Sequence, residues 1–199
     1  MTATKEISIE VGPRFYTLYN VDMTDFSRIT TRGGDSGQTS IADGSRRSKD
    51  DMLIDVIGEV DELHAQLGLL KASLTEVLDK DDIEWIEQRM LRIGGMLAVP
   101  PDHEAYASIQ RVTDADIDHL EKRQKEMMDE VDLPPLFVTY GETESGARAD
   151  VARAVCRRVE RRMVRLIRER VMTDLTPAQR FLNRLSDWLF IRARLLDAC

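Results

Sequence analysis

Apolar residues recur every three or four positions along five stretches of the chain, the spacing of a helix that buries one face. In residues 52–70 the stripe consists of Leu53, Val56, Val60, Leu63, Leu67 and Leu70. In residues 81–97 it consists of Ile83, Ile86, Met90, Ile93 and Leu97. Pro100 and Pro101 follow the second stretch, and proline cannot continue a helix. Both stretches are therefore predicted to be helices of a bundle.

Three more helices are predicted in the second half of the chain. Residues 113–131 begin with an N-cap threonine and acids in the first turn, and their weaker stripe is Ile117, Leu120, Met127 and Val131. Residues 144–172 place Val151, Val155, Val159, Met163 and Leu166 on the predicted core face. Residues 176–197 have Pro177 in the first turn, where proline is tolerated. The pattern predicts an all-α fold, a five-helix bundle.

The first 28 residues show no sustained period. They are expected to form an irregular N-terminal extension with one short strand near residues 6–11. The bundle domain is predicted to span residues 29–199. It begins with a glycine-rich loop, TTRGGDSGQTS at residues 30–40, and continues through a polar stretch at residues 43–51 into the first helix.

Composition agrees with helices and narrows the function. The chain has 199 residues, 42% of them hydrophobic and only 6% aromatic, and its net charge of −8 argues against nucleic acid as a partner. Two cysteines favour a reducing compartment over a structural disulfide. No apolar run could span a membrane and no secretion signal opens the chain, so a cytoplasmic protein without a membrane partner is expected. The three histidines lack a liganding spacing, and no metal site is predicted.

Residues 153–170 contain eight arginines and only two glutamates in a protein that is acidic as a whole. On a helix, one sector would hold Arg153, Arg157, Glu160 and Arg161, and another would hold Arg158, Arg162, Arg165 and Arg168. Such a run is commonly a solvated face with ion pairs. The first sector lies near the core stripe, so partial burial is expected there, and arginine can bind phosphate or carboxylate in two places.

Other polar residues are candidates to join these arginines. Asp61 lies at the edge of the first helix's stripe and is either a solvated acid or the partner of one arginine. Asn183 and Asp187 are one turn apart on the last helix. The glycine-rich loop lacks the Walker A pattern, yet glycines let backbone amides approach an anion. It is either a flexible connection or a polyphosphate site.

Four segments together resemble the propanediol-utilisation-type ATP:cob(I)alamin adenosyltransferases. They are TRGGDSGQT at residues 31–39 with RRSKDD at residues 46–51, GEVDEL at residues 58–63, VARAVCRRVER at residues 151–161, and LNRLSD at residues 182–187. The resemblance implies a ferritin-like up-and-down bundle that forms a homotrimer, with ATP and corrinoid bound where subunits meet. It implies transfer of the 5′-deoxyadenosyl group of ATP to reduced cobalamin, the second substrate, with Mg²⁺ on the triphosphate. A cobalamin-dependent mutase or dehydratase is the expected recipient of the product.

The resemblance also assigns residues. The ATP site would comprise Thr31, Arg32, Gly33, Gly34, Thr39, Ser40, Lys49, Arg157, Glu160, Arg161 and Asn183. The corrinoid would contact Phe137, Asp61 and Arg153, the last two forming an intersubunit salt bridge. Asp61, Phe137, Arg153 and Arg157 are the expected catalytic residues.

Two other functions stay open from the sequence. The family often has Leu-Pro-Gly-Gly after this phenylalanine, whereas residues 139–142 read TYGE. A non-catalytic trimeric relative that binds ATP or a corrinoid as sensor or carrier would fit that change. A helical interaction protein that docks an acidic partner on its arginines is the third reading.

Overall fold

The computed structural model describes residues 30–131, 133 and 138–198. The chain forms two compact units, Met1–Ser36 and Gly37–Cys199. In the first unit the described residues form a turn, in which the Asp35 amide donates to the Arg32 carbonyl at 3.3 Å. Arg32 has a left-handed φ of 56°. The strand expected near residues 6–11 lies outside the described residues.

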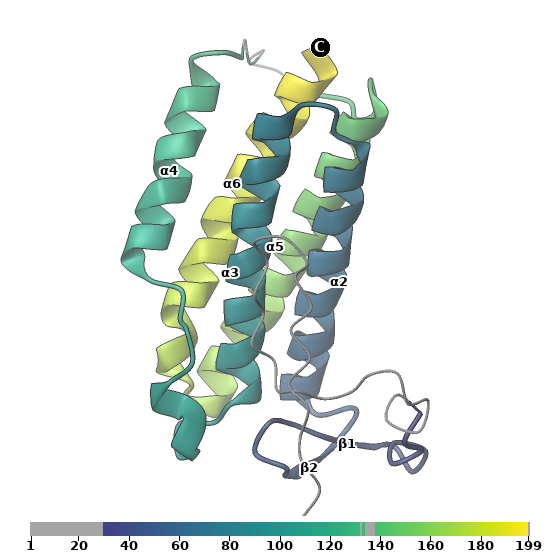
Figure 1. Cartoon of the computed structure of the whole chain (residues 1–199), viewed down its shortest axis with the longest axis vertical. Helices are drawn as coiled ribbons and strands as arrows, with labels where there is room; N and C mark the ends of the chain where they lie inside the picture. The colour runs from purple at the N-terminus through teal and green to yellow at the C-terminus, as the bar shows by residue number, and fades with distance from the viewer. Residues whose placement is uncertain (1–29, 132, 134–137, 199) are drawn as a thin grey trace, which may run out of the picture. The chain divides into compact units, whose positions relative to one another are not determined.

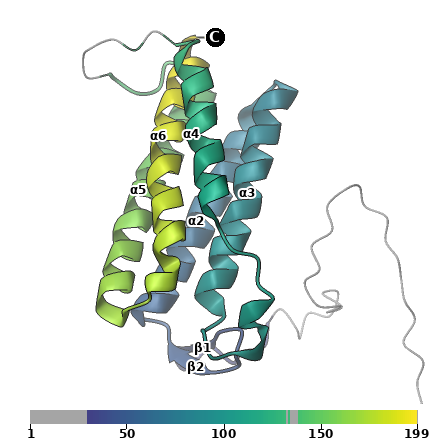
Figure 2. The same ribbon diagram turned by 90° about the vertical axis from the view of Figure 1, so that its left-hand side faces the viewer.

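The second unit is a helical bundle, which confirms the predicted fold class (Figure 1). Its helices are α2 (Met52–Ser73), α3 (Val77–Ala98), α4 (Asp114–Met128), α5 (Glu144–Arg170) and α6 (Thr176–Ala198). The helix α5 packs on both α2 and α6, α3 packs on α2, and α4 packs on α6. Figure 2, turned by 90° from Figure 1, shows α4 running alongside α6. Short 3-10 turns at Glu104–Ala107 and Thr173–Leu175 complete the connections.

A small antiparallel hairpin precedes α2, where only a polar stretch was expected. Its strands are β1 (Gln38–Ser40) and β2 (Arg46–Ser48), and Thr39 pairs with Arg47 in the register. Three-residue strands without alternating apolar residues carry no sequence signal. The Ala42 amide in the hairpin turn donates to the Ala98 carbonyl at 3.2 Å, which ties the hairpin to the end of α3.

The core follows the predicted stripes with one correction. The predicted stripe residues of α2 and α3 are buried, and so are Val155 to Leu166 at the stripe positions of α5. Val151 is 50% exposed, so its predicted place on the core face is wrong. Steps of four residues turn about 40° too far per step, and three steps carry Val151 roughly 120° from Met163. Ala149 and Ala152 are buried instead.

Side chains cap the N-terminal ends of α4 and α5. Thr113 and Asp116 form a capping box at the start of α4, as the threonine and its acids predicted. At the start of α5 the Thr143 hydroxyl accepts from the Gly146 amide at 3.0 Å. The Thr143 amide donates to the Asp197 carboxylate near the end of α6 at 3.1 Å. The start of α5 is thereby fixed to the end of α6.

Candidate functional site

The arginines of α5 fall into several groups by their partners. One group pairs with acids of α2: Arg158 binds Glu59 and Glu62, and Arg162 lies 3.1 Å from Asp55. These ion pairs form a ladder between two packed helices, while Arg165 and Arg168 pair with Glu169 of their own helix. Exposed pairs of this kind contribute little each.

Arg157 and Arg161 belong to another group. Both are exposed, contrary to the partial burial that their nearness to the core stripe suggested. Each step of four residues turns them further from Arg153, which is only 19% exposed at its side chain. Within the part of the chain that the structure describes, neither arginine forms an ion pair. Their guanidinium groups are thus available to an anion.

Glu160 lies between these two arginines in sequence and is oriented by α6. Its carboxylate accepts from the Asn183 amide at 3.0 Å and from the Gln179 amide at 3.3 Å. Sequence reasoning named Asn183 but missed Gln179, one turn earlier on the same helix. The spacing of four residues was the available signal. Asp187, the other candidate on that face, is exposed and does not join Glu160.

Cys156 lies beside this group without taking part in chemistry. Its thiol is free and buried, and Sγ donates to the Leu182 carbonyl at 3.2 Å. Burial raises the pKa of this thiol, and the nearby carboxylates of Glu160 and Asp187 raise it further. A thiol held neutral is a poor nucleophile and metal ligand. Cys156 is therefore a packing residue.

Arg153 belongs to a separate cluster at the start of α5. Its Nε lies 3.4 Å from Asp150, and its Nη2 donates to the Tyr140 hydroxyl at 2.9 Å. Buried Arg194 of α6 binds the other oxygen of Asp150. Tyr140 stands in the TYGE segment that departs from the family's usual Leu-Pro-Gly-Gly, whereas Arg194 was not among the predicted residues. Asp61 of α2 is exposed and has no ion-pair partner among the described residues of its own chain.

The predicted glycine-loop residues fall in two places. Thr39 and Ser40 lie in β1, and the exposed Lys49 follows β2, where its amide donates to the Gly37 carbonyl at 2.9 Å. Thr31 to Gly34 belong to the other compact unit, where the Gly33 amide approaches the Thr31 hydroxyl at 3.4 Å. Phe137 lies outside the described residues.

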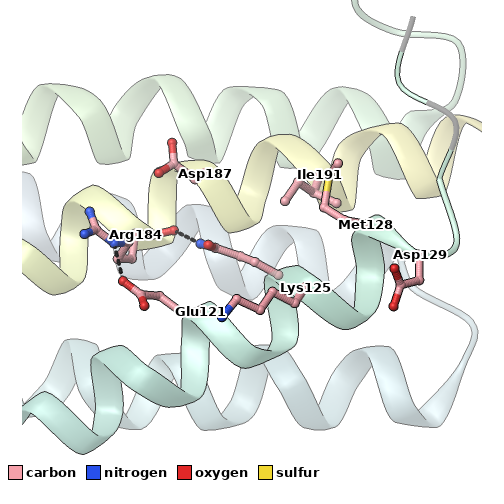
Figure 3. A pocket seen from close by; sticks show the side chains of 8 residues that line it. Glu121, Lys125, Met128, Asp129, Arg184, Asp187 and Ile191 are labelled. Carbon is pink, nitrogen blue, oxygen red and sulfur yellow. Dashed lines mark hydrogen bonds and ion pairs between the residues drawn. The ribbon is translucent and has the colours of Figure 1, made fainter.

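A pocket of about 470 Å³ lies between α4 and α6. It is lined by Glu121, Gln124, Lys125, Met128, Asp129, Arg184, Asp187 and Ile191 (Figure 3). Glu121 binds Arg184 at 2.6 Å, and Arg184 also donates to the Asn183 side chain at 2.6 Å, so the pocket lies next to one predicted residue and includes the candidate Asp187. Its lining carries three acids against two bases, which suits a triphosphate less well than the α5 arginines do.

In residues 30–131, 133 and 138–198, no group of three or more His, Cys, Asp or Glu side chains is arranged to hold a metal ion. Over the same residues, no helix combines the length and apolar character that crossing a bilayer requires.

Comparison with known proteins shows what this chain resembles. A family model described as cobalamin adenosyltransferase matches residues 29–196. A corrinoid adenosyltransferase of Citrobacter freundii is 35% identical over 169 residues, covering 84% of this chain and 94% of that protein. A cobalamin adenosyltransferase of Cupriavidus metallidurans is 36% identical over 177 residues, covering 86% of this chain and 89% of that protein.

Solved structures have the same fold. One is a phenylalanine-to-alanine variant of a PduO-type ATP:corrinoid adenosyltransferase from Lactobacillus reuteri, complexed with cobalamin and ATP. It matches with a TM-score of 0.78 and 30% identity, over 85% of this chain and 93% of that one. An arginine-to-lysine variant of such an enzyme, complexed with ATP, gives 0.77 and 32%, over 85% and 94% of the two chains.

Proposed function

The chain belongs to the cobalamin adenosyltransferase family, and from this premise we propose that it transfers the 5′-deoxyadenosyl group of ATP to the cobalt of reduced cobalamin. The observation that carries the proposal is the exposed pair Arg157 and Arg161, which flank a carboxylate oriented by Asn183. The two arginines are free to bind a polyanion. Relatives whose structures hold ATP and cobalamin support the same activity.

The reaction needs no nucleophile or general base from the protein. The electron pair of cob(I)alamin attacks C5′ of ATP, the cobalt–carbon bond forms, and the C5′–oxygen bond breaks. Triphosphate leaves with the bonding electrons, and adenosylcobalamin is the other product. Protein groups then contribute by holding the two substrates in line and by stabilising charge on the leaving group.

The charge of each α5 residue indicates which part of the nucleotide it would contact. Arg157 and Arg161 suit the triphosphate, because guanidinium groups bind phosphate oxygens through two parallel hydrogen bonds. Glu160 would repel the phosphates, so it suits a hydroxyl or amino group of the nucleoside. Asn183 keeps the Glu160 carboxylate in place at 3.0 Å. We assign Thr31, Arg32, Gly33, Gly34, Thr39, Ser40 and Lys49 to the same nucleotide.

Mg²⁺ suits this chain as a companion of ATP. The described residues contain no cluster of ligands for a resident metal ion. Magnesium retains several waters and is commonly bound through substrate phosphates with few protein ligands. The ion would neutralise part of the triphosphate charge that the arginines also face.

The corrinoid site requires a second subunit in this proposal. Asp61 is exposed on α2 and has no partner within the described chain, which leaves it available to Arg153 of a neighbouring copy. Phe137 is proposed to pack against the corrin ring on the strength of the resemblance. Three copies would form three such sites. A cytoplasmic location and a cobalamin-dependent mutase or dehydratase as recipient belong to the same proposal.

The test is turnover by the purified protein under anaerobic conditions. ATP, Mg²⁺ and chemically reduced cobalamin are mixed, and the visible spectrum is followed for adenosylcobalamin. Arg157→Ala is expected to lower kcat/KM by about 100-fold or more, the loss typical of a group that stabilises charge in the transition state. Arg158→Ala is the matched control, because Arg158 is bound to Glu59 and Glu62 in its own chain.

The outcomes separate the possible functions. Arg158→Ala should stay within about threefold of the wild type, as expected for an exposed ion pair. ATP binding without product would contradict the enzyme and support a sensor or carrier. Equal losses in both variants would contradict the assignment of Arg157 to the nucleotide.

A further inference from the structure

Tyr140 joins the segment that precedes α5 to the side chain of Arg153. We propose that Tyr140 is a positioning residue that holds the Arg153 guanidinium in place for the corrinoid substrate. The inference rests on the proposed function, which puts Arg153 beside the corrinoid. Tyr140 itself need not touch either substrate.

Arg153 is held from three sides. Its Nη2 donates to the Tyr140 hydroxyl at 2.9 Å, and its Nε donates to Asp150 at 3.4 Å. Its guanidinium carbon also lies 5.4 Å from the centre of the Tyr140 ring and 5.8 Å from that of Phe190, within cation–π range. The side chain is only 19% exposed as a result.

The segment that carries Tyr140 is anchored on both sides of the residue. Before it, Arg194 of α6 donates to the Thr139 carbonyl at 3.4 Å. After it, Gly141 turns with a φ of 94°, and Thr143 caps α5 while its amide binds Asp197. The tyrosine is therefore presented to Arg153 by a fixed backbone.

A buried ion cluster supports the same arrangement. Arg194 is 7% exposed and binds both Asp150 and Asp197, the latter at 3.1 Å. Arg153 shares Asp150 with it, so two cations face two carboxylates and their charges balance. A buried cation with balanced partners is held rigidly, because losing a partner would leave a buried charge. Asp150 is thus a fixed acceptor for Arg153.

Burial does not explain Tyr140, a residue that is 60% exposed. A residue on the surface contributes little to the core, but its hydroxyl and ring restrict an arginine that otherwise samples many rotamers. Restricting a side chain before binding reduces the entropy lost when the substrate arrives. Tyr140 should therefore affect the substrate that Arg153 meets and spare the nucleotide, which is bound by other residues.

The experiment compares Tyr140→Phe with the wild type in the full chain. The change removes the hydroxyl and keeps the ring. The KM for cob(I)alamin should rise about three- to tenfold, the effect of one hydrogen bond, while the KM for ATP stays within twofold. Tyr106→Phe is the matched control, since its hydroxyl donates to Asp174 at 2.9 Å and its ring lies 3.9 Å from the Arg111 guanidinium carbon. It should change neither value.

A double substitution identifies the route of the effect. If Tyr140 acts through Arg153, adding Tyr140→Phe to Arg153→Ala should cause no further loss of corrinoid affinity, which equilibrium titration measures even where turnover is nearly absent. An undiminished loss in that background, an equal rise in both KM values, or no change in Tyr140→Phe would each overturn the inference.

Binding without turnover keeps this test separate from that of the activity. Equilibrium titration with cob(II)alamin measures corrinoid affinity even in a protein that makes no adenosylcobalamin. The same three- to tenfold weakening in Tyr140→Phe is expected there. An inactive wild type would refute the proposed function, an active one with an unchanged Tyr140→Phe would refute only this inference, and a wild type that binds no corrinoid would refute both.

Discussion

At the scale of single residues, two side chains of α6 orient one carboxylate of the proposed nucleotide site. Glu160 is held by Asn183 at 3.0 Å and by Gln179 at 3.3 Å. Both donors come from the same face of α6, and the Asn183 side chain also accepts from Arg184 at 2.6 Å. If Glu160 contacts the nucleotide, removing either donor should weaken ATP binding, and removing the donor with the shorter hydrogen bond should weaken it more.

Asn183→Ala removes the shorter of these bonds. The KM for ATP is expected to rise about tenfold, because a hydrogen bond to a charged group contributes about 1.5 kcal/mol or more. Gln179→Ala should cause a smaller rise. Steady-state kinetics and calorimetric titration with ATP measure both effects. A larger effect of Gln179→Ala, or an effect of either variant on cobalamin alone, would contradict the assignment of Glu160 to the nucleotide.

Gly146 tests the contact between the start of α5 and the end of α6. A Cβ there would lie 2.0 Å from the Asp197 carboxylate oxygen that binds Thr143. Gly146→Ala is expected to reduce the free energy of unfolding by about 1–3 kcal/mol, the usual range for overpacking. Gly94→Ala in α3 has open space around its Cβ and should be neutral or stabilising by up to about 1 kcal/mol. Urea denaturation of both variants checks this, and equal stabilities would contradict the close packing.

At the scale of elements, α4 depends on an acid that serves both as a cap and as an ion-pair partner. Asp116 accepts from the Thr113 amide at 2.9 Å and from Arg89 of α3 at 2.9 Å. Burial alone would raise the pKa of Asp116, but these hydrogen bonds outweigh it and lower the pKa below its ordinary value of 3.8. Folding therefore favours the charged form of Asp116. The ion pair of this carboxylate with Arg89 joins α4 to α3.

The sign of this shift gives a pH-dependent prediction. A lowered folded pKa adds stability above the unfolded pKa of about 3.9, and that stability is lost as pH falls through the folded value. Asp116→Asn should cost about 1–3 kcal/mol at pH 7, and its deficit against the wild type should shrink below pH 4. Urea denaturation at pH 7 and pH 3 measures both. Asp114→Asn, at an exposed acid of the same turn, should change little, and a deficit for Asp116→Asn that grew at low pH would contradict the shift.

Helices were predictable here because burial imposes a period on the sequence. The stripe of α2 could be read residue by residue, and the proline pair after α3 marked its end. The prediction was wrong at Val151. Stripe residues spaced four apart drift around the helix, and after three such steps Val151 no longer shares a face with Met163. The hairpin was not predicted, because Thr39 and Arg47 pair through backbone atoms and this pairing leaves no pattern in the side chains. Local periodicity therefore predicts elements but not small backbone pairings.

The candidate site was predictable only in part, for a related reason. Residue type and spacing on one helix picked out Arg157 and Glu160, and Asn183 followed from the resemblance. Gln179 and Tyr140 take part through contacts between elements. The spacing of Gln179 from Asn183 and the departure at residues 139–142 are visible in the sequence, but the partners Glu160 and Arg153 are not. The partners of Arg158 could not be known before α2 and α5 were placed side by side.

At the scale of the whole molecule, Asp61 is an exposed charge without an ion-pair partner among the described residues of its own chain. The ladder between α2 and α5 uses Glu59, Glu62 and Asp55 internally. Asp61, on the same helix, is exposed and takes no part in that ladder among the described residues. The proposed trimer gives Asp61 a partner in Arg153 of the next copy, and every site then contains residues from two chains.

Subunit mixing tests this directly. Asp61→Ala and Arg153→Ala should each be nearly inactive alone, because each breaks every interface site. Mixed under conditions that exchange subunits, a site is intact when one chain supplies Asp61 and its neighbour supplies Arg153. With equal amounts and random assembly this holds for about a quarter of sites, so activity should recover to roughly a quarter of the wild-type value. Two variants altered at the same residue, Asp61→Ala and Asp61→Asn, should show no recovery on mixing. A pair at Asp61 and Arg153 that stays inactive while native mass spectrometry shows mixed trimers would place both residues in one chain's site.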